Sequence, residues 1–128
     1  MSDLNSQRNR VVWFDLPVRD SDPACRFHEV LLGLTVHCEA FGQIHFGVLA
    51  HGQGNGGCLV PGTPASDPET GLLVYLNAEG RLREALAQAV LCGGRVLEAI
   101  RSIGPHGYRA IVLDSEGNRI ALHSQVDR

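Results

Sequence analysis

Apolar and polar residues alternate along two separate stretches of this chain, at residues 12–18 and 72–78. In each stretch one parity is entirely apolar, whereas the other mixes apolar residues with aromatic and polar ones. This period of two predicts two strands, each with one face that must be buried. The segments that follow, 22–32 and 81–92, carry apolar residues at helical spacing, which predicts a helix after each strand.

This order of elements occurs twice, at an offset of sixty residues. The matching positions are Leu16, Val18, Val30, Leu31, Gly33 and Val36 in the first half and Leu76, Ala78, Val90, Leu91, Gly93 and Val96 in the second. Glycine readily adopts the left-handed conformation that ends a helix, so Gly33 and Gly93 are expected to be helix stops. A repeat of this length is too long for a solenoid unit. It predicts two equivalent modules around one central space.

Three further strands are expected in each half of the chain. They are 35–40, 43–50 and 57–60 in the first half, and 95–100, 107–114 and 119–124 in the second. Residues 114–118 are rich in turn formers and predict the last hairpin. The predicted fold class is therefore α+β, with two βαβββ modules that form a concave mixed sheet and helices on the outer face. The first helix, with Asp22 as its cap, is expected to cover the back of the first strand.

The predicted organisation is a polar N-terminal tail and one domain. The expected segments are the tail 1–10, the domain 11–128, module one at 11–61, a linker at 62–70 and module two at 71–124. Since 128 residues with 44% hydrophobic content fit one ordinary soluble core, no further domain is expected.

Charge and cysteine usage narrow the classes of partner. The net charge of −3, with interspersed Arg and acidic residues, argues against a nucleic-acid partner, and no apolar run approaches the roughly 20 residues of a membrane span. The cysteines Cys25, Cys38, Cys58 and Cys92 show no paired spacing, and no signal-peptide core precedes them. Reduced thiols in a cytoplasmic protein are therefore expected.

Strand parity also predicts where a ligand binds. The face of the sheet turned away from the helices is expected to carry Trp13, Asp15, Tyr75, Asn77, Arg119 and His123. A mixed aromatic and polar lining suits a cavity for a small organic molecule better than it suits a dry core. Asp15 and Tyr75 are counterparts at the offset of sixty, so they are expected to approach one another, within a chain or across a dimer.

Together these segments resemble the vicinal oxygen chelate superfamily of glyoxalases, bleomycin-resistance proteins and dioxygenases. The resemblance is carried by residues 14–20 with Ala24, Phe27 and 32–34, and by 93–94, 107–110 and 114–122. It is closest to predicted enzymes related to lactoylglutathione lyase. The resemblance implies paired βαβββ modules, a homodimer, and a concave site between the modules.

The resemblance also locates four inward positions where metal enzymes of that superfamily carry their ligands. In this chain they fall on Trp13, Leu73, Ala121 and either Leu59 or Pro61. None of these side chains can coordinate a divalent metal, so no metal and no cofactor are expected. His37, His45 and His51 remain as an alternative, displaced metal site.

Two classes of function follow. The first is a metal-free protein that binds a small molecule, in which Trp13 either stacks on a planar ligand or fills the volume left by the metal. The second is a metal-independent lyase or isomerase, in which His123 acts as general base together with Asp15 or Tyr75.

Overall fold

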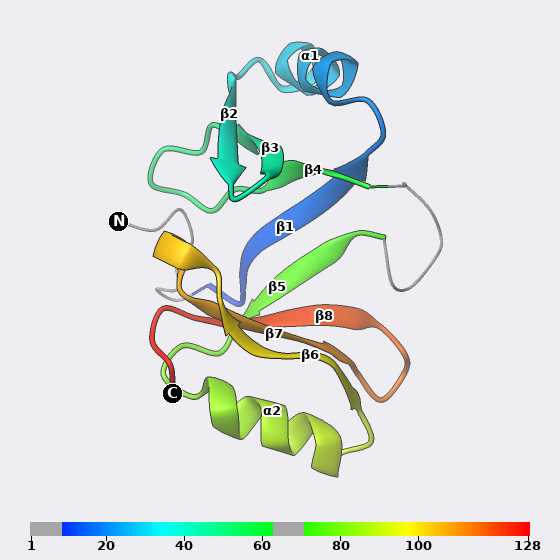
Figure 1. The fold of residues 1–128 in the computed structure, drawn as a ribbon, viewed down its shortest axis with the longest axis vertical. Helices are drawn as coiled ribbons and strands as arrows, with labels where there is room; N and C mark the ends of the chain where they lie inside the picture. The colour runs from blue at the N-terminus through cyan, green and yellow to red at the C-terminus, as the bar shows by residue number, and fades with distance from the viewer. Residues whose placement is uncertain (1–8, 63–70) are drawn as a thin grey trace.

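The computed structural model describes residues 9–62 and 71–128, and within them eight strands form one mixed sheet accompanied by two α-helices (Figure 1). The first module comprises β1 (Val11–Val18), α1 (Ser21–Leu32), β2 (Val36–Phe41), β3 (Ile44–Leu49) and β4 (Cys58–Pro61). The second comprises β5 (Leu73–Asn77), α2 (Leu82–Leu91), β6 (Arg95–Ser102), the 3₁₀ turn η1 (Gly104–His106), β7 (Tyr108–Leu113) and β8 (Arg119–Ser124). The predicted α+β class and the two βαβββ modules are confirmed.

The two modules join through their first strands. The strand order is β2-β3-β4-β1-β5-β8-β7-β6, so each module contributes one half of the sheet. β1 and β5 pair antiparallel at the centre, while β1 pairs parallel with β4 and β5 pairs parallel with β8. The central space predicted from the repeat therefore forms within one chain.

α2 covers the outer face of the second module as parity predicts. Leu82 at its start is fully buried, and it packs with Val112 of β7 and Leu122 of β8. Full burial of each such side chain stabilises the fold by about 1.5–3 kcal/mol. Gly93 follows the helix with φ +96°, as the predicted stop requires.

α1 departs from the prediction in its contacts and in its cap. Its main contacts are with β4, β2 and β3 rather than with β1, and the Glu29 carboxylate accepts a hydrogen bond from the Val36 amide at the start of β2 (3.0 Å). This bond ties the helix to β2, and Figure 1 shows α1 at the same end of the molecule as β2. Asp20 occupies the cap position without a side-chain bond, so Asp22 lies inside the first turn and is not the cap. Its Gly33 stop is confirmed, with φ +65°.

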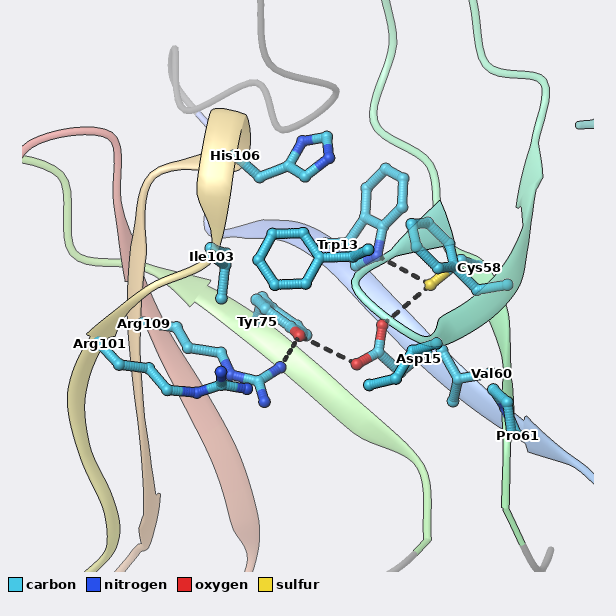
Figure 2. A pocket seen from close by; sticks show the side chains of 13 residues that line it. Trp13, Asp15, Cys58, Val60, Pro61, Tyr75, Arg101, Ile103, His106 and Arg109 are labelled. Atoms are coloured by element: carbon cyan, nitrogen blue, oxygen red, sulfur yellow. Dashed lines mark hydrogen bonds between the residues drawn. The ribbon is translucent and has the colours of Figure 1, made fainter. Parts of the chain in front are cut away.

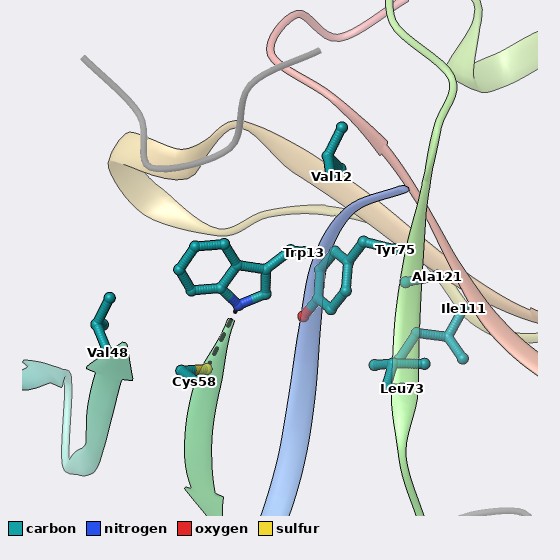
Figure 3. Packing of buried hydrophobic residues seen from close by; sticks show 8 residues of the cluster. All are labelled: Val12, Trp13, Val48, Cys58, Leu73, Tyr75, Ile111 and Ala121. Atoms are coloured by element: carbon teal, nitrogen blue, oxygen red, sulfur yellow. Dashed lines mark hydrogen bonds between the residues drawn. The ribbon is translucent and has the colours of Figure 1, made fainter. Parts of the chain in front are cut away.

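The concave face carries a core that both modules build. Its buried members are Val12, Trp13, Val48, Cys58, Leu73, Tyr75, Ile111 and Ala121 (Figure 3). A β-bulge between Val11 and Trp13 sets the register in which Trp13 pairs with Tyr75 across the module junction. Trp13 and Tyr75 are therefore neighbours in one cluster.

Most of the predicted tail and linker, residues 1–8 and 63–70, lies outside the described residues. Neither α1 nor α2, the two α-helices described, is long and apolar enough to cross a membrane. The homodimer stays a prediction. Exposed apolar side chains on α1, Phe27 at 62% and Val30 at 84%, are where a second copy would find apolar surface.

Gly94 is expected to be intolerant of a side chain. A Cβ at this position would lie 2.6 Å from the Leu113 carbonyl oxygen and 2.8 Å from that of Ala89, and backbone atoms have little freedom to move away. Gly94→Ala should lower the free energy of unfolding by about 1–3 kcal/mol, typical of overpacking, in urea denaturation. Gly54→Ala is the control, because its nearest contact would be an ordinary 3.4 Å. Equal stability of the two variants would contradict the packing described.

Candidate functional site

A cavity of about 360 Å³ opens on the concave face between the modules. Its apolar walls include Phe41, Ile44, Phe46, Val60 and Ile103. Trp13, Asp15 and Tyr75 also line it, from the two central strands, and Arg101 and Arg109 come from β6 and β7 (Figure 2). The cavity thus combines an apolar wall with a few polar groups on rigid strands.

A hydrogen-bonded chain surrounds the Asp15 carboxylate. The Tyr75 hydroxyl donates to Oδ2 of Asp15 (2.9 Å), and the Cys58 thiol donates to Oδ1 (3.1 Å). The Trp13 indole N–H in turn donates to the Cys58 sulfur (3.4 Å) (Figure 2). The predicted approach of Asp15 to Tyr75 is confirmed, and it occurs within a single chain.

The series of hydrogen bonds continues from Tyr75 to Arg109 and then, through Glu98, to Arg101. Nη1 of Arg109 donates to the Tyr75 hydroxyl oxygen (2.5 Å), and Nε of Arg109 donates to Oε1 of Glu98 (2.9 Å). Arg101 donates through Nε to the same Glu98 oxygen (3.0 Å). One carboxylate therefore holds two guanidinium groups beside the cavity.

Burial dominates the protonation equilibria at the cavity. It raises the pKa of Asp15, even though hydrogen bonds from Cys58 and Tyr75 and the charge of Arg109 act to lower it. Burial, and then the charge of Asp15, also raise the pKa of Tyr75 and of Cys58, so both groups remain protonated donors at neutral pH. Partial burial of Glu98 acts to raise its pKa, but the hydrogen bonds and charges of Arg109 and Arg101 outweigh it, and the pKa of Glu98 is lowered.

The structure brings together three of the six residues predicted to line one pocket. Trp13, Asp15 and Tyr75 line the cavity, whereas Asn77, Arg119 and His123 do not. The Asn77–His123 pair lies two residues further along β5 and β8 than the Tyr75–Ala121 pair. All four residues therefore share one face of the sheet but differ in their position along the strands. Parity therefore predicted the face correctly, but it carries no information about the position along the strand.

Each of the other three residues has its own environment. His123 is fully buried, and its Nε2 lies 2.6 Å from the carbonyl oxygen of His106. Asn77 donates to the Asn9 carbonyl oxygen (2.8 Å). Arg119 lies at the start of β8, in an adjoining cavity of about 340 Å³, and donates to the Gly71 carbonyl oxygen (3.3 Å). A general base at His123 would have no direct access to the main cavity.

Sequence reasoning missed Arg101, Arg109 and Glu98. Arg109 pairs with His123 and so shares the concave face, which alternation along β7 could have revealed. β6 is different: its register against β7 shifts between Glu98, which pairs with Ile111, and Arg101, which pairs with Arg109. The extra residue of this bulge places Glu98 and Arg101 on one face, although strict alternation would separate them.

The positions that the resemblance assigns to metal ligands do not fit a metal ion. Trp13, Leu73 and Ala121 belong to the buried apolar cluster, and Leu59 is only 1% exposed. Across residues 9–62 and 71–128, no three His, Cys, Asp or Glu side chains are grouped to hold a metal. The displaced site is therefore not formed by His37, His45 and His51, and the His51 ring instead packs edge-on against Trp13.

Comparison with known proteins supports the fold. No family model and no curated protein sequence matches the chain. An NAD-dependent benzaldehyde dehydrogenase from Legionella pneumophila is similar in structure, with a TM-score of 0.61 and 13% identity over 88% of this chain and 96% of that chain. A methylmalonyl-CoA epimerase from Streptomyces coelicolor, in complex with 2-nitronate-propionyl-CoA, has a TM-score of 0.65 and 17% identity over 91% of this chain and 96% of that chain.

A hypothetical protein from Bacillus halodurans is also similar, with a TM-score of 0.68 and 11% identity over 91% of this chain and 94% of that chain. At such identities these likenesses show the fold alone. Since the epimerase and the dehydrogenase structures have the vicinal oxygen chelate fold, the comparison supports the fold that the sequence resemblance implied.

The raised pKa of Asp15 predicts a specific pH dependence of stability. Between the ordinary pKa of 3.8 and the higher folded value, the folded state binds more protons than the unfolded state. The Asp15 contribution to the free energy of unfolding therefore falls as pH rises through that window. Urea denaturation at pH 4 and pH 7 should show the stability of the wild type falling relative to Asp15→Asn.

Asp114→Asn is the matched control. Hydrogen bonds from Asn118 and from backbone amides lower the pKa of the Asp114 carboxyl, so its contribution is lost as pH falls. In a pH series that extends below the ordinary pKa of 3.8, the two variants should therefore change in opposite directions, Asp15→Asn above that value and Asp114→Asn below it. The same pH dependence in both would contradict the environment described for Asp15.

Proposed function

We propose that this protein binds a small organic molecule, with a largely apolar body, in the cavity between its two modules. The observation that carries the proposal is the partly buried Asp15–Tyr75–Arg109 hydrogen-bond chain beside an apolar cavity of about 360 Å³. Pockets for small molecules measure roughly 300–1,000 Å³ and combine apolar walls with a few placed polar groups.

The energetics of the polar groups support this proposal. A buried carboxylate costs several kcal/mol unless donors satisfy it, and replacing a buried charged group by a well-packed apolar side chain is often neutral or stabilising. Asp15 is therefore better explained by a role in binding than by stability. Donors from Tyr75 and Cys58 keep the carboxylate in place at the edge of the cavity. Such groups can orient a ligand whose apolar part packs against Phe46 and Ile103.

The similar structures add support of a general kind. The Streptomyces coelicolor epimerase holds 2-nitronate-propionyl-CoA, so a protein of this fold can accommodate an organic ligand. Trp13, Leu73 and Ala121 offer no metal ligand, so the proposal relies on the polar side chains of the cavity itself.

Filling the cavity should prevent binding. In a thermal-shift screen of metabolites and antibiotics, compounds that bind the folded protein should raise its Tm. They should also change the fluorescence of Trp13, the single tryptophan of the chain, which lines the cavity. Val60→Phe places a ring inside the cavity and should abolish both responses, whereas Leu72→Phe, at a position 53% exposed, should retain them.

Both responses should persist in EDTA, because no residue at the inward positions offers a metal ligand. Ligand responses that survive in Val60→Phe would place binding elsewhere. Responses lost in EDTA, or one equivalent of tightly bound zinc, nickel or iron per chain, would overturn the metal-free account.

Proton transfer is a second candidate function, favoured by one observation. Asp15, with its raised pKa, lies 2.9 Å from the Tyr75 hydroxyl, which Arg109 contacts in turn. The carboxylate could take a proton from a carbon beside a carbonyl group and return it, while Tyr75 and Arg109 stabilise the negative charge on oxygen. This would be lyase or isomerase chemistry without His123.

Solvent exchange separates the two functions. If the protein is an enzyme of this kind, a bound carbonyl compound should exchange its adjacent C–H for deuterium in D₂O, as followed by NMR. Asp15→Asn should then lower the exchange rate by about 100-fold or more, typical of a lost general base, with little change in Kd. Exchange at the uncatalysed rate with tight binding would leave binding as the function.

A further inference from the structure

We infer that the ligand carries a carboxylate, or a similar planar anion, and that Arg101 and Arg109 bind this group. The inference rests on the proposed binding function and names the class of ligand. Its observations are the pairing of the two arginines across β6 and β7, the single carboxylate of Glu98 between them, and the guanidinium nitrogens that find no partner among the described residues.

Arg101 and Arg109 face one another directly in the sheet. They are cross-strand partners in the β6–β7 pair, and both line the cavity (Figure 2). Like charges placed opposite one another destabilise a sheet. The arrangement therefore calls for negative charge at this point, and Glu98 supplies only part of it.

Glu98 orients both guanidinium groups through one atom. Its Oε1 accepts a hydrogen bond from Nε of each arginine, at 2.9 Å for Arg109 and 3.0 Å for Arg101. Because both contacts use Nε, neither arginine uses a terminal nitrogen in its hydrogen bond to Glu98. A bulge in β6 makes this geometry available, since it brings Glu98 and Arg101 to one face.

Most of the terminal nitrogens make no hydrogen bond to the residues that the structure describes. Nη1 of Arg109 donates to Tyr75, but Nη2 of Arg109 and both terminal nitrogens of Arg101 make no hydrogen bond to any residue within 9–62 or 71–128. The guanidinium fork matches the two oxygens of a carboxylate. The side chain of Arg109 is 16% exposed and that of Arg101 50%, so an anion would meet one enclosed and one accessible cation.

The other charged groups of the region are less suited to a ligand. Both Asp15 oxygens already accept donors, from Cys58 and Tyr75, so a cationic ligand would compete with bonds that exist. Arg119 lies in the adjoining cavity and donates to the Gly71 carbonyl oxygen. The anion is therefore placed at Arg101 and Arg109, with the apolar body of the ligand against Phe46, Ile44 and Ile103.

Three probes of similar size test the inference: 3-phenylpropionate, 3-phenylpropionamide and 3-phenylpropylamine. Their dissociation constants are measured by Trp13 fluorescence and calorimetry at low salt and pH 7. The carboxylate should bind at least about 10-fold more tightly than the amide, as expected for charged hydrogen bonds, and the amine should bind most weakly. Added salt should weaken the binding of the carboxylate but not that of the uncharged amide, because Arg101 is partly exposed to solvent and its charge is screened.

Substitutions locate the charge. Arg101→Gln should weaken the binding of the carboxylate by about 10-fold and leave the affinity for the amide unchanged. The Arg101 side chain is half exposed, so the variant is expected to fold. Arg83→Gln is the matched control, because Arg83 pairs with Asp127 on the surface and is absent from the cavity lining. Binding to this control should equal that of the wild type.

Several results would overturn the inference while leaving the proposed function standing. Equal affinities for the three probes would mean that the cavity recognises only the apolar part of the ligand. Tightest binding of the amine would assign the charge recognition to Asp15. Loss of carboxylate preference in Arg119→Gln, but not in Arg101→Gln, would move the anion to the adjoining cavity. Failure of all three probes to bind at millimolar concentration would count against the proposed function as well.

Discussion

The hydrogen bond between Tyr75 and Asp15 is the contact on which the rest of the site depends. It crosses the junction of the two modules, from β5 to β1, at the centre of the sheet. A buried carboxylate left without donors would cost several kcal/mol, whereas a hydrogen bond to a charged group contributes about 1.5–3 kcal/mol. The hydrogen bond to Asp15 therefore holds the Tyr75 hydroxyl in position, and this hydroxyl in turn accepts a hydrogen bond from Arg109.

Apolar side chains occupy the centre of the fold, at the positions where the sequence resemblance implied metal ligands. Trp13, Leu73 and Ala121 pack into one cluster with Ile111, so this region contributes stability instead of coordination. Polar chemistry begins immediately beside that cluster, at Asp15 and Tyr75. The proposed function follows from this arrangement, because an apolar cluster and the hydrogen-bonded polar residues beside it can together orient an organic molecule.

The sequence predicted much of this arrangement because the repeat and the strand parity are local signals. The offset of sixty brought Asp15 to Tyr75, and parity placed Trp13 on the concave face. Position along a strand is not a local signal, so Asn77 and His123 were placed in a pocket that they do not reach. The bulges in β6 interrupt the alternation, which hid Glu98 and Arg101. The packing of α1 on β2–β4 depends on tertiary contacts such as Glu29 to Val36, which helical periodicity does not encode.

Chemical-shift mapping tests most directly whether the cavity between the modules is the binding site. A ¹⁵N spectrum reports the single indole N–H of Trp13 and the Nε–H signals of Arg101 and Arg109, all on cavity-lining side chains. On titration with a compound that raises the Tm, these signals should shift together with one Kd. Shifts confined to α1, around the exposed side chains of Phe27 and Val30, with the Trp13 and arginine signals unchanged, would contradict the account.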